Sequence, residues 1–176
     1  MKKNTFYFMM AFAAALCLYS CKPKEKIVLV DNNVTGYYNY EATIVEVGAQ
    51  GTAVIKAWGT AASIDEAKED AKRNAVRAII FKGFPSSANV NSTDLRPMAT
   101  EPNAEQVHRD YFAQFFKDGG KYSQYVWFAD QTGNIATGDL VRKGTLYKVG
   151  MVVVVDKNNL RKELESAGVI KKFGIN

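Results

Sequence analysis

The side chains that could carry out covalent or acid–base chemistry are few in this chain. It contains one histidine, His108, and two cysteines, Cys17 and Cys21. A serine or cysteine hydrolase needs a base beside its nucleophile, and the sequence has no Gly-x-Ser-x-Gly motif and no second histidine. A metal site would need further ligands near His108, which we therefore interpret as a surface residue. We expect a protein that is not an enzyme and has no cofactor or metal, although a hydrolase with paired carboxylates stays open.

The N-terminal residues predict a chemical modification of Cys21. Residues 1–4 are basic, and residues 5–18 are apolar but shorter than the ~20 residues that a membrane-spanning helix needs. Leu18-Tyr-Ser-Cys21 then resembles the bacterial lipobox, with leucine three residues before the cysteine and a small residue directly before it. This resemblance implies signal cleavage between Ser20 and Cys21, a diacylglycerol on the Cys21 thiol and an acyl chain on its new amine. The alternative is an ordinary secretory signal in which Cys21 has no role.

An acylated Cys21 would decide where the protein works. Two or three acyl chains hold a protein stably on a bilayer, whereas one gives only marginal binding. We therefore expect attachment at the cell outer membrane with the domain facing the periplasm, although the cell surface stays open. The mature chain would keep one cysteine and hence have no internal disulfide. Without Lys2 and Lys3 it would carry 21 basic and 18 acidic residues, a mild excess that does not favour nucleic acid as a partner.

Composition divides the chain into four parts. We expect a lipoprotein signal peptide (1–20), a lipid-anchored tether with a first strand (21–40), an α+β domain (41–168) and a C-terminal tail (169–176). Within the tether, residues 21–26 are typical of a solvated linker, although their lysines could also contact anionic head groups. Residues 27–30, Ile-Val-Leu-Val, predict a short early strand.

The stretch from Thr52 to Gly83 predicts a strand that runs into a helix, and the rest of the domain is organised around it. Residues 52–60 alternate roughly in polarity and follow a turn at 48–51, so together with residues 41–47 they predict a β-hairpin. We expect Trp58 in this strand to lie in the core or to cover a sheet edge.

The helix after this strand is predicted from its first residues and from its alanines. Ser63 and Glu66 form a capping-box pattern, and Gly83 is typical of a helix end. Alanines recur at spacings of four, four and three, which places on one helix face Ala67, Ala71, Ala75 and Ala78. Because these side chains are small, the helix axis can lie close to the element on which it packs.

Two further helices are predicted downstream. Residues 104–117 predict one whose apolar side includes Val107, Tyr111 and Phe115. Asp156 can cap the last helix. The buried side of that helix would comprise Leu160, Leu164 and Ala167.

Strands are predicted between and before these helices. We expect one at 124–129 and one or two within 140–155, with a break near 142–144. The continuous valines at 152–155 predict a central strand that is covered on both faces or placed at a partner interface.

Two motifs of the domain together resemble a known family. One is Ala67-x-x-x-Ala71-x-x-Asn74-Ala75-Val76 after a strand that ends in glycine. The other is Tyr147-x-Val149-x-Met151-Val152-x-Val154 followed by Leu160-x-x-x-Leu164-x-x-x-Gly168. Over residues 52–168 this pattern resembles the N-terminal domain of flagellar assembly protein T and related small outer-membrane lipoproteins of bacteria. The resemblance implies an α+β fold, an antiparallel sheet with about three helices packed against it, and protein–protein assembly rather than catalysis.

The sequence also offers candidate contact residues. Tyr37, Tyr38, Tyr40 and Trp127 could contact a partner or stack on a ligand, although such tyrosines also commonly edge a sheet. They support an alternative function, a surface or periplasmic binding module for an extracellular ligand such as glycan. The long polar loop at 84–102 is a further place where we expect a partner contact, and it departs from the family pattern. The expected partner is another envelope protein or a second copy of the chain.

Overall fold

The computed structural model describes residues 40–85 and 95–172, which belong to one compact unit spanning Gly36–Asn176. The predicted signal peptide, Cys21, the tether up to residue 39 and the early strand at 27–30 lie outside the described residues, as do residues 86–94 of the loop at 84–102. None of the described helices combines the length and the apolar composition that crossing a membrane requires.

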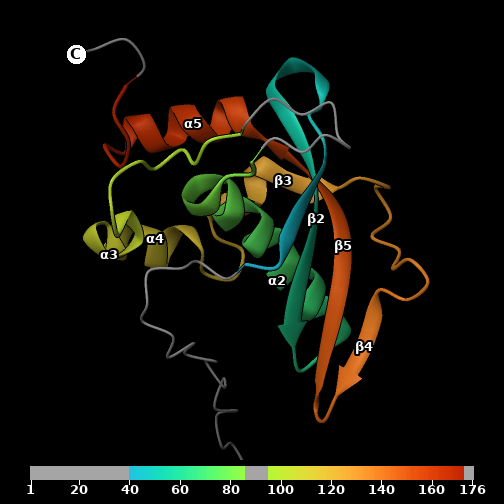
Figure 1. The fold of residues 1–176 in the computed structure, drawn as a ribbon. Helices are drawn as coiled ribbons and strands as arrows, with labels where there is room; N and C mark the ends of the chain where they lie inside the picture. The colour runs from blue at the N-terminus through green and yellow to red at the C-terminus, as the bar shows by residue number, and fades with distance from the viewer. Residues whose placement is uncertain (1–39, 86–94, 173–176) are drawn as a thin grey trace, which may run out of the picture. The chain divides into compact units, whose positions relative to one another are not determined.

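An antiparallel sheet forms the centre of the domain (Figure 1). Its strands run in the order β1 (Ala42–Glu46), β2 (Thr52–Ala61), β5 (Leu146–Asp156) and β3 (Val126–Phe128), and β4 (Leu140–Lys143) pairs with the other end of β5. The helices are α2 (Ile64–Arg77), α3 (Ala104–Val107), α4 (Arg109–Phe115) and α5 (Lys157–Ser166). The predicted α+β class, with an antiparallel sheet and about three helices packed against it, is confirmed.

The structure contains two hairpins, of which the first was predicted. β1 and β2 are joined through the short 3-10 turn η2 (Ala49–Gly51), where Gln50 and Gly51 adopt positive φ angles of 57° and 83°. β4 and β5 form the second hairpin and are joined at Gly144 and Thr145, so the break expected near 142–144 lies at the end of that range and separates two strands.

Helix α2 begins and packs as its sequence predicts. The Ser63 hydroxyl accepts a hydrogen bond from the Glu66 N–H at 3.2 Å, which caps the first turn. Three alanines of the predicted face, Ala67, Ala71 and Ala75, are fully buried against the sheet. Between the backbones of α2 and β2 there is room only for glycine, because a Cβ on Gly59 would lie 2.1 Å from the Ala67 carbonyl oxygen.

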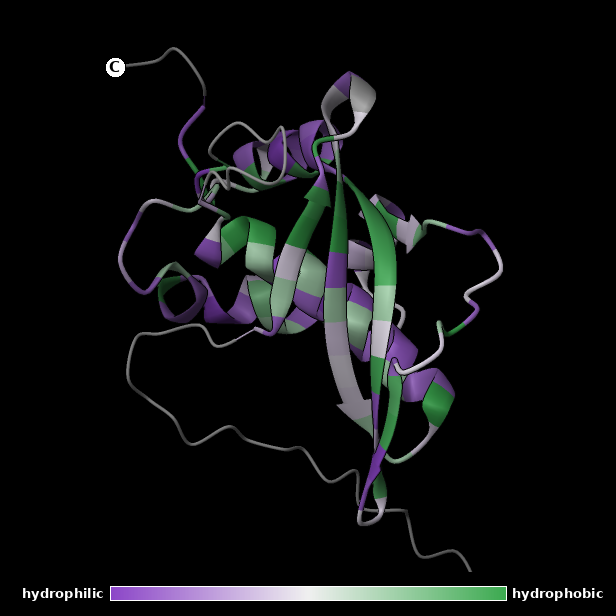
Figure 2. Ribbon diagram, turned by 45° about the vertical axis from the view of Figure 1, so that its right-hand side comes forward, coloured by the Kyte–Doolittle hydropathy of each residue, from purple (hydrophilic) through white to green (hydrophobic). Residues whose placement is uncertain are grey.

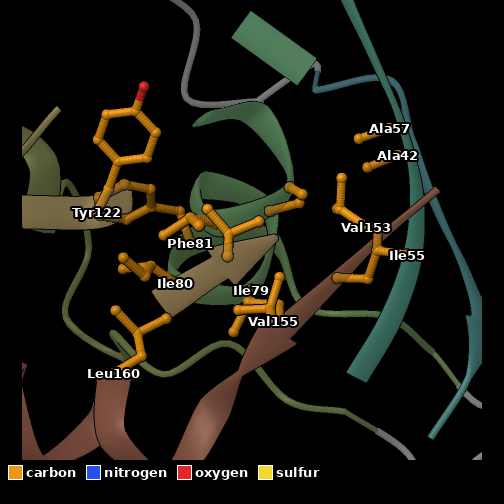
Figure 3. Close-up of a cluster of buried hydrophobic side chains, with 14 of the residues drawn as sticks. Ala42, Ile55, Ala57, Ile79, Ile80, Phe81, Tyr122, Val153, Val155 and Leu160 are labelled. Atoms are coloured by element: carbon orange, nitrogen blue, oxygen red, sulfur yellow. The ribbon is translucent and has the colours of Figure 1, made fainter. Parts of the chain in front are cut away.

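The end of α2 widens into a π-helical turn, η3 (Ala78–Lys82), before Gly83. Such a turn leaves backbone carbonyls without their usual intrahelical donors. The chain returning from the loop supplies donors, because the N–H groups of Met98 and Ala99 donate to the Ile79 and Ile80 carbonyls at 3.2 and 2.9 Å. Side chains from η3, β2, β5 and α5 then meet in one core (Figure 3).

Two predicted elements differ in detail. The helix expected at 104–117 is broken at His108, whose φ of −105° separates α3 from α4. The break lets α4 bury Phe112 and Phe115, but it leaves Val107 59% exposed, so Val107 does not share their apolar side. In the segment expected as a strand at 124–129, only β3 is extended, since Lys121–Tyr125 form the 3-10 helix η4 and bury Tyr122 instead.

The last helix, α5, forms with its predicted cap. The Asp156 carboxylate accepts a hydrogen bond from the Asn159 N–H at 3.0 Å. Leu160 and Leu164 are fully buried as expected, whereas Ala167 is exposed because the helix has ended at Ser166.

Candidate functional site

The sheet has one face packed on helices and one face turned outward. Alternate residues of β2 point to opposite faces, so Ala53, Ile55 and Ala57 are fully buried against the helices. Val54, Lys56 and the other even-numbered residues of β2 point to the second face, which we call the outer face. Among the described residues, no helix covers the outer face (Figure 1).

This arrangement corrects the prediction made for the valine run. β5 is central, since β2 pairs with one edge of it and β3 and β4 with the other. It is not covered on both faces, because Val153 and Val155 are fully buried while Val152 on the outer face stays 37% exposed. A continuous run of valines shows no alternation, and therefore could not reveal which face lacks a cover. The alternative, a partner interface, stays a prediction.

One half of the outer face is apolar. Register places Trp127 of β3 opposite Val154 of β5, and Val154 opposite Val54 of β2, so the three side chains form a row across the sheet. Val152 lies on the same face next to this row. We call these four residues the apolar patch; Trp127 is 44% exposed within it. Figure 2 shows β5 as largely hydrophobic over the half that leads into α5.

The other half of the outer face is centred on Trp58. Its ring lies over Gly150 of the neighbouring strand, since a Cβ at Gly150 would be 3.1 Å from the indole. The Nζ atoms of Lys56 and Lys148 lie 5.6 and 4.9 Å from the ring centroid, within range of cation–π attraction. Trp58 is therefore neither a core residue nor an edge cover. The polar residues at 56 and 60 share its face and could have indicated this from the sequence.

The charges around Trp58 are paired. Lys56 donates to Asp139 Oδ1 at 2.7 Å, which ties β2 to the chain just before β4. Lys148 of β5 pairs with Glu41, which precedes β1. These two ion pairs flank Trp58 and connect strands of the sheet to the segments before β4 and β1. The charges of Lys56 and Lys148 are therefore already engaged within the fold.

The predicted contact residues do not gather in one place. Ser20, Cys21, Tyr37 and Tyr38 lie outside the described residues. Tyr40 leads into β1 at one edge of the sheet, whereas Trp127 lies on β3 at the opposite edge.

Tyr40 is held by neighbouring elements rather than presented to solvent. Its hydroxyl donates to Glu105 Oε2 at 3.1 Å, and its ring centroid lies 5.9 Å from the Arg77 guanidinium. Its carbonyl accepts a hydrogen bond from Lys82 Nζ at 3.0 Å. These contacts dock the start of β1 on α3 and on the end of α2, so Tyr40 and Trp127 cannot stack on one small ligand together.

The single histidine has an acidic neighbour but no metal-binding group around it. His108 Nε2 lies 3.6 Å from Glu101 Oε2 at the break between α3 and α4. Across 40–85 and 95–172, no three His, Cys, Asp or Glu side chains are placed to hold a metal ion. A hollow of about 480 Å³ lies nearby between η3 and the returning loop, lined by Phe81, Arg96, Pro97, Ala99, Thr100, Glu101, Pro102 and Asn103.

A polar cluster that joins three elements is built around Glu163 of α5. Its Oε1 accepts from Lys121 Nζ at 2.6 Å and from the Tyr111 hydroxyl at 3.3 Å, and its Oε2 accepts from the Tyr125 hydroxyl at 3.3 Å. The hydrogen bond from Lys121 holds the pKa of Glu163 below its usual value. Burial and the neighbouring carboxylate raise the pKa of Tyr111. The cluster joins α5 to α4 and η4, and its donors are already occupied by Glu163.

Replacing Glu163 with Gln should destabilise the domain in a pH-dependent manner. Glu163 has a lower pKa in the folded state, so its stabilisation is present above the unfolded pKa of about 4.3 and is lost as pH falls through the folded pKa. Because Lys121 is half exposed, we expect a loss of only about 1 kcal/mol at neutral pH. Urea denaturation of the parent and the variant should show that their difference in unfolding free energy disappears at acidic pH. A difference that does not change with pH would contradict the prediction. An equal loss of stability in the control Glu46→Gln on β1 would contradict it too.

The polar clusters and the apolar patch differ in what they can do chemically. Around Trp58 and Glu163 the donors and acceptors satisfy one another, which stabilises the fold. The apolar patch has no covering element in the described part of the chain, so only another molecule, or chain outside that part, can bury it. No protein-family model, no curated protein and no solved structure matches this chain.

Proposed function

We propose that the protein is a non-enzymatic, lipid-anchored component of the cell envelope. It is attached at the outer membrane through acylated Cys21 and faces the periplasm. It works by assembling with another envelope protein or with a second copy of itself. The lipobox at Leu18–Cys21 supports the attachment, and the resemblance to outer-membrane lipoproteins over 52–168 supports assembly as the activity.

The observation that carries the assembly proposal is the apolar patch. Single exposed apolar side chains are common, but here the exposed Trp127 and Val152 adjoin the partly exposed Val54 and Val154. Such a contiguous apolar surface is typical of an interaction surface. Tryptophan is enriched in the parts of protein interfaces that contribute most binding energy. The patch also lies on strands that are hydrogen-bonded to one another, so little chain entropy would be lost when a partner binds.

Photo-crosslinking in the cells that make the protein tests this proposal. A photoreactive amino acid at position 152, inside the apolar patch, should give a discrete protein adduct. The matched position is Lys162, which is exposed on α5 at the helical side of the domain. We expect no adduct from position 162, and we expect Trp127→Ala to lower the adduct yield from position 152 severalfold.

The adduct itself separates the possible partners. Its mass distinguishes a second copy of the chain from a different envelope protein, and either result supports assembly. Absence of a protein adduct at 152, or equal yields at 152 and 162, contradicts it. If the purified protein were instead retained on a glycan array and Trp127→Ala abolished that retention, the glycan-binding alternative would take its place.

A further inference from the structure

The hairpin of β4 and β5 projects at the end of the sheet away from α5 (Figure 1). All of β4 is exposed, including two large apolar residues, Leu140 at 45% and Val141 at 46%. Successive residues of a strand point to opposite faces, so these two side chains lie on opposite faces of the hairpin. A protein packed against one face would cover only one of them, whereas a surrounding medium could cover both.

Two cations lie next to these apolar side chains. Arg142 Nε donates to the Gly144 carbonyl at 3.3 Å, and its guanidinium lies 5.7 Å from the Tyr147 ring centroid. Within the described parts of the chain, neither Arg142 nor Lys143 forms an ion pair with a carboxylate. Residues 140–155 contain no Asp or Glu, so the positive charge at the tip is not offset within the hairpin sequence.

This combination matches the interfacial region of a bilayer. Leucine and valine side chains enter the boundary between head groups and acyl chains, while Arg and Lys extend from their apolar stems to phosphate. An Arg guanidinium can donate two parallel hydrogen bonds to one phosphate group. Each cation close to an anionic leaflet strengthens binding by about fivefold.

We propose that the tip of the β4–β5 hairpin, residues 140–147, docks on a bilayer surface that contains anionic phospholipid. Leu140 and Val141 enter the head-group region, and Arg142 and Lys143 contact lipid phosphates. The chain from Cys21 to Tyr40 is long enough to extend about 65 Å, so an acyl anchor alone would leave the orientation of the domain open. The hairpin contact fixes that orientation and leaves the apolar patch, at the other end of β5, away from the bilayer surface.

Vesicle sedimentation of the chain from residue 21 with Cys21→Ser tests the proposal without any acyl group or partner protein. The result of this experiment therefore does not depend on whether the protein assembles with a partner. We expect the protein to sediment with vesicles that contain phosphatidylglycerol and to stay in solution with pure phosphatidylcholine. High salt should release it, because the attraction of exposed charges is screened. Failure to sediment with the anionic vesicles at low salt overturns the proposal.

Charge reversal locates the contact. Arg142→Glu combined with Lys143→Glu should weaken binding to the anionic vesicles by about 25-fold or more. The matched control is Arg109→Glu combined with Lys162→Glu, which makes the same charge change on exposed helix residues. The control should bind within a few-fold of the parent. Equal losses in the two variants would mean that net charge alone drives binding, and this overturns a specific hairpin contact.

A fluorescent label shows whether the tip enters the interface. The Cys21→Ser chain from residue 21 contains no other cysteine, so Thr145→Cys gives a unique thiol at the tip. An environment-sensitive dye at 145 should shift to the blue with anionic vesicles. The same dye on Ser166→Cys, at the end of α5, should not shift. Identical spectra at the two sites contradict the assigned orientation.

Discussion

Replacing Gly59 with alanine should destabilise the domain by about 3 kcal/mol or more and lower its melting temperature by about 10 °C. The added Cβ would lie 2.1 Å from the Ala67 carbonyl oxygen and 2.3 Å from the Ala71 nitrogen. Both atoms belong to the backbone of α2, so no side chain can move aside. The helix would have to withdraw from β2 and lose the burial of its alanine face.

The same displacement would stretch the polar contacts between α2 and β2. Asp70 accepts a hydrogen bond from the Thr60 N–H at 3.0 Å, and Asn74 donates to the Trp58 carbonyl at 2.9 Å. Breaking such part-buried bonds adds to the packing loss. Thermal and urea denaturation followed by circular dichroism would measure the change.

Gly150 provides the matched control, because it lies on the paired strand directly opposite Trp58. A Cβ there would meet the Trp58 ring and the Asp139 side chain at 3.1 and 3.2 Å. These groups can shift by a few tenths of an ångström, so Gly150→Ala should cost about 1 kcal/mol or less. If Gly59→Ala were as stable as Gly150→Ala, the close approach of α2 to β2 would be refuted.

Replacing Cys21 with serine should release the protein from the membrane fraction almost completely. Each buried methylene contributes about 0.8 kcal/mol to anchoring, so two or three acyl chains dominate every other membrane contact. A serine hydroxyl cannot take the thioether-linked diacylglycerol. Fractionation of cells, together with the intact mass of the mature chain, measures both the release and the missing lipid.

Cys17 offers a control within the same segment. It lies in the predicted signal peptide, so Cys17→Ser should leave both the lipid and the membrane attachment unchanged. A wild-type mature chain without the added acyl mass would contradict the lipoprotein proposal. Undiminished membrane attachment of Cys21→Ser at high salt would contradict it too, because the hairpin contact alone is released by salt.

The sequence by itself determined the features that depend on neighbours along the chain. The β1–β2 hairpin follows from the turn before Thr52, and the start of α2 follows from Ser63 and Glu66. The alanine face of α2 and the cap at Asp156 are equally local, since hydrogen bonds and helical spacing connect residues three or four apart. For the same reason, the α+β class could be predicted before any contact between distant elements was known.

Only the tertiary structure decided which surfaces are left exposed. The order β1-β2-β5-β3 brings Trp127 beside Val154 and Val54, which are far away in sequence. The helices cover only one face of that sheet. The run of valines in β5 does not alternate with polar residues, so the covered face could not be predicted from it. Tyr40 and Trp127 are both aromatic residues that the sequence offers as candidate contact residues. In the structure Tyr40 is docked on α3, whereas Trp127 is exposed at the opposite edge of the sheet. Strand pairing and helix placement are non-local, so the apolar patch and the projecting hairpin appear only when the chain is folded.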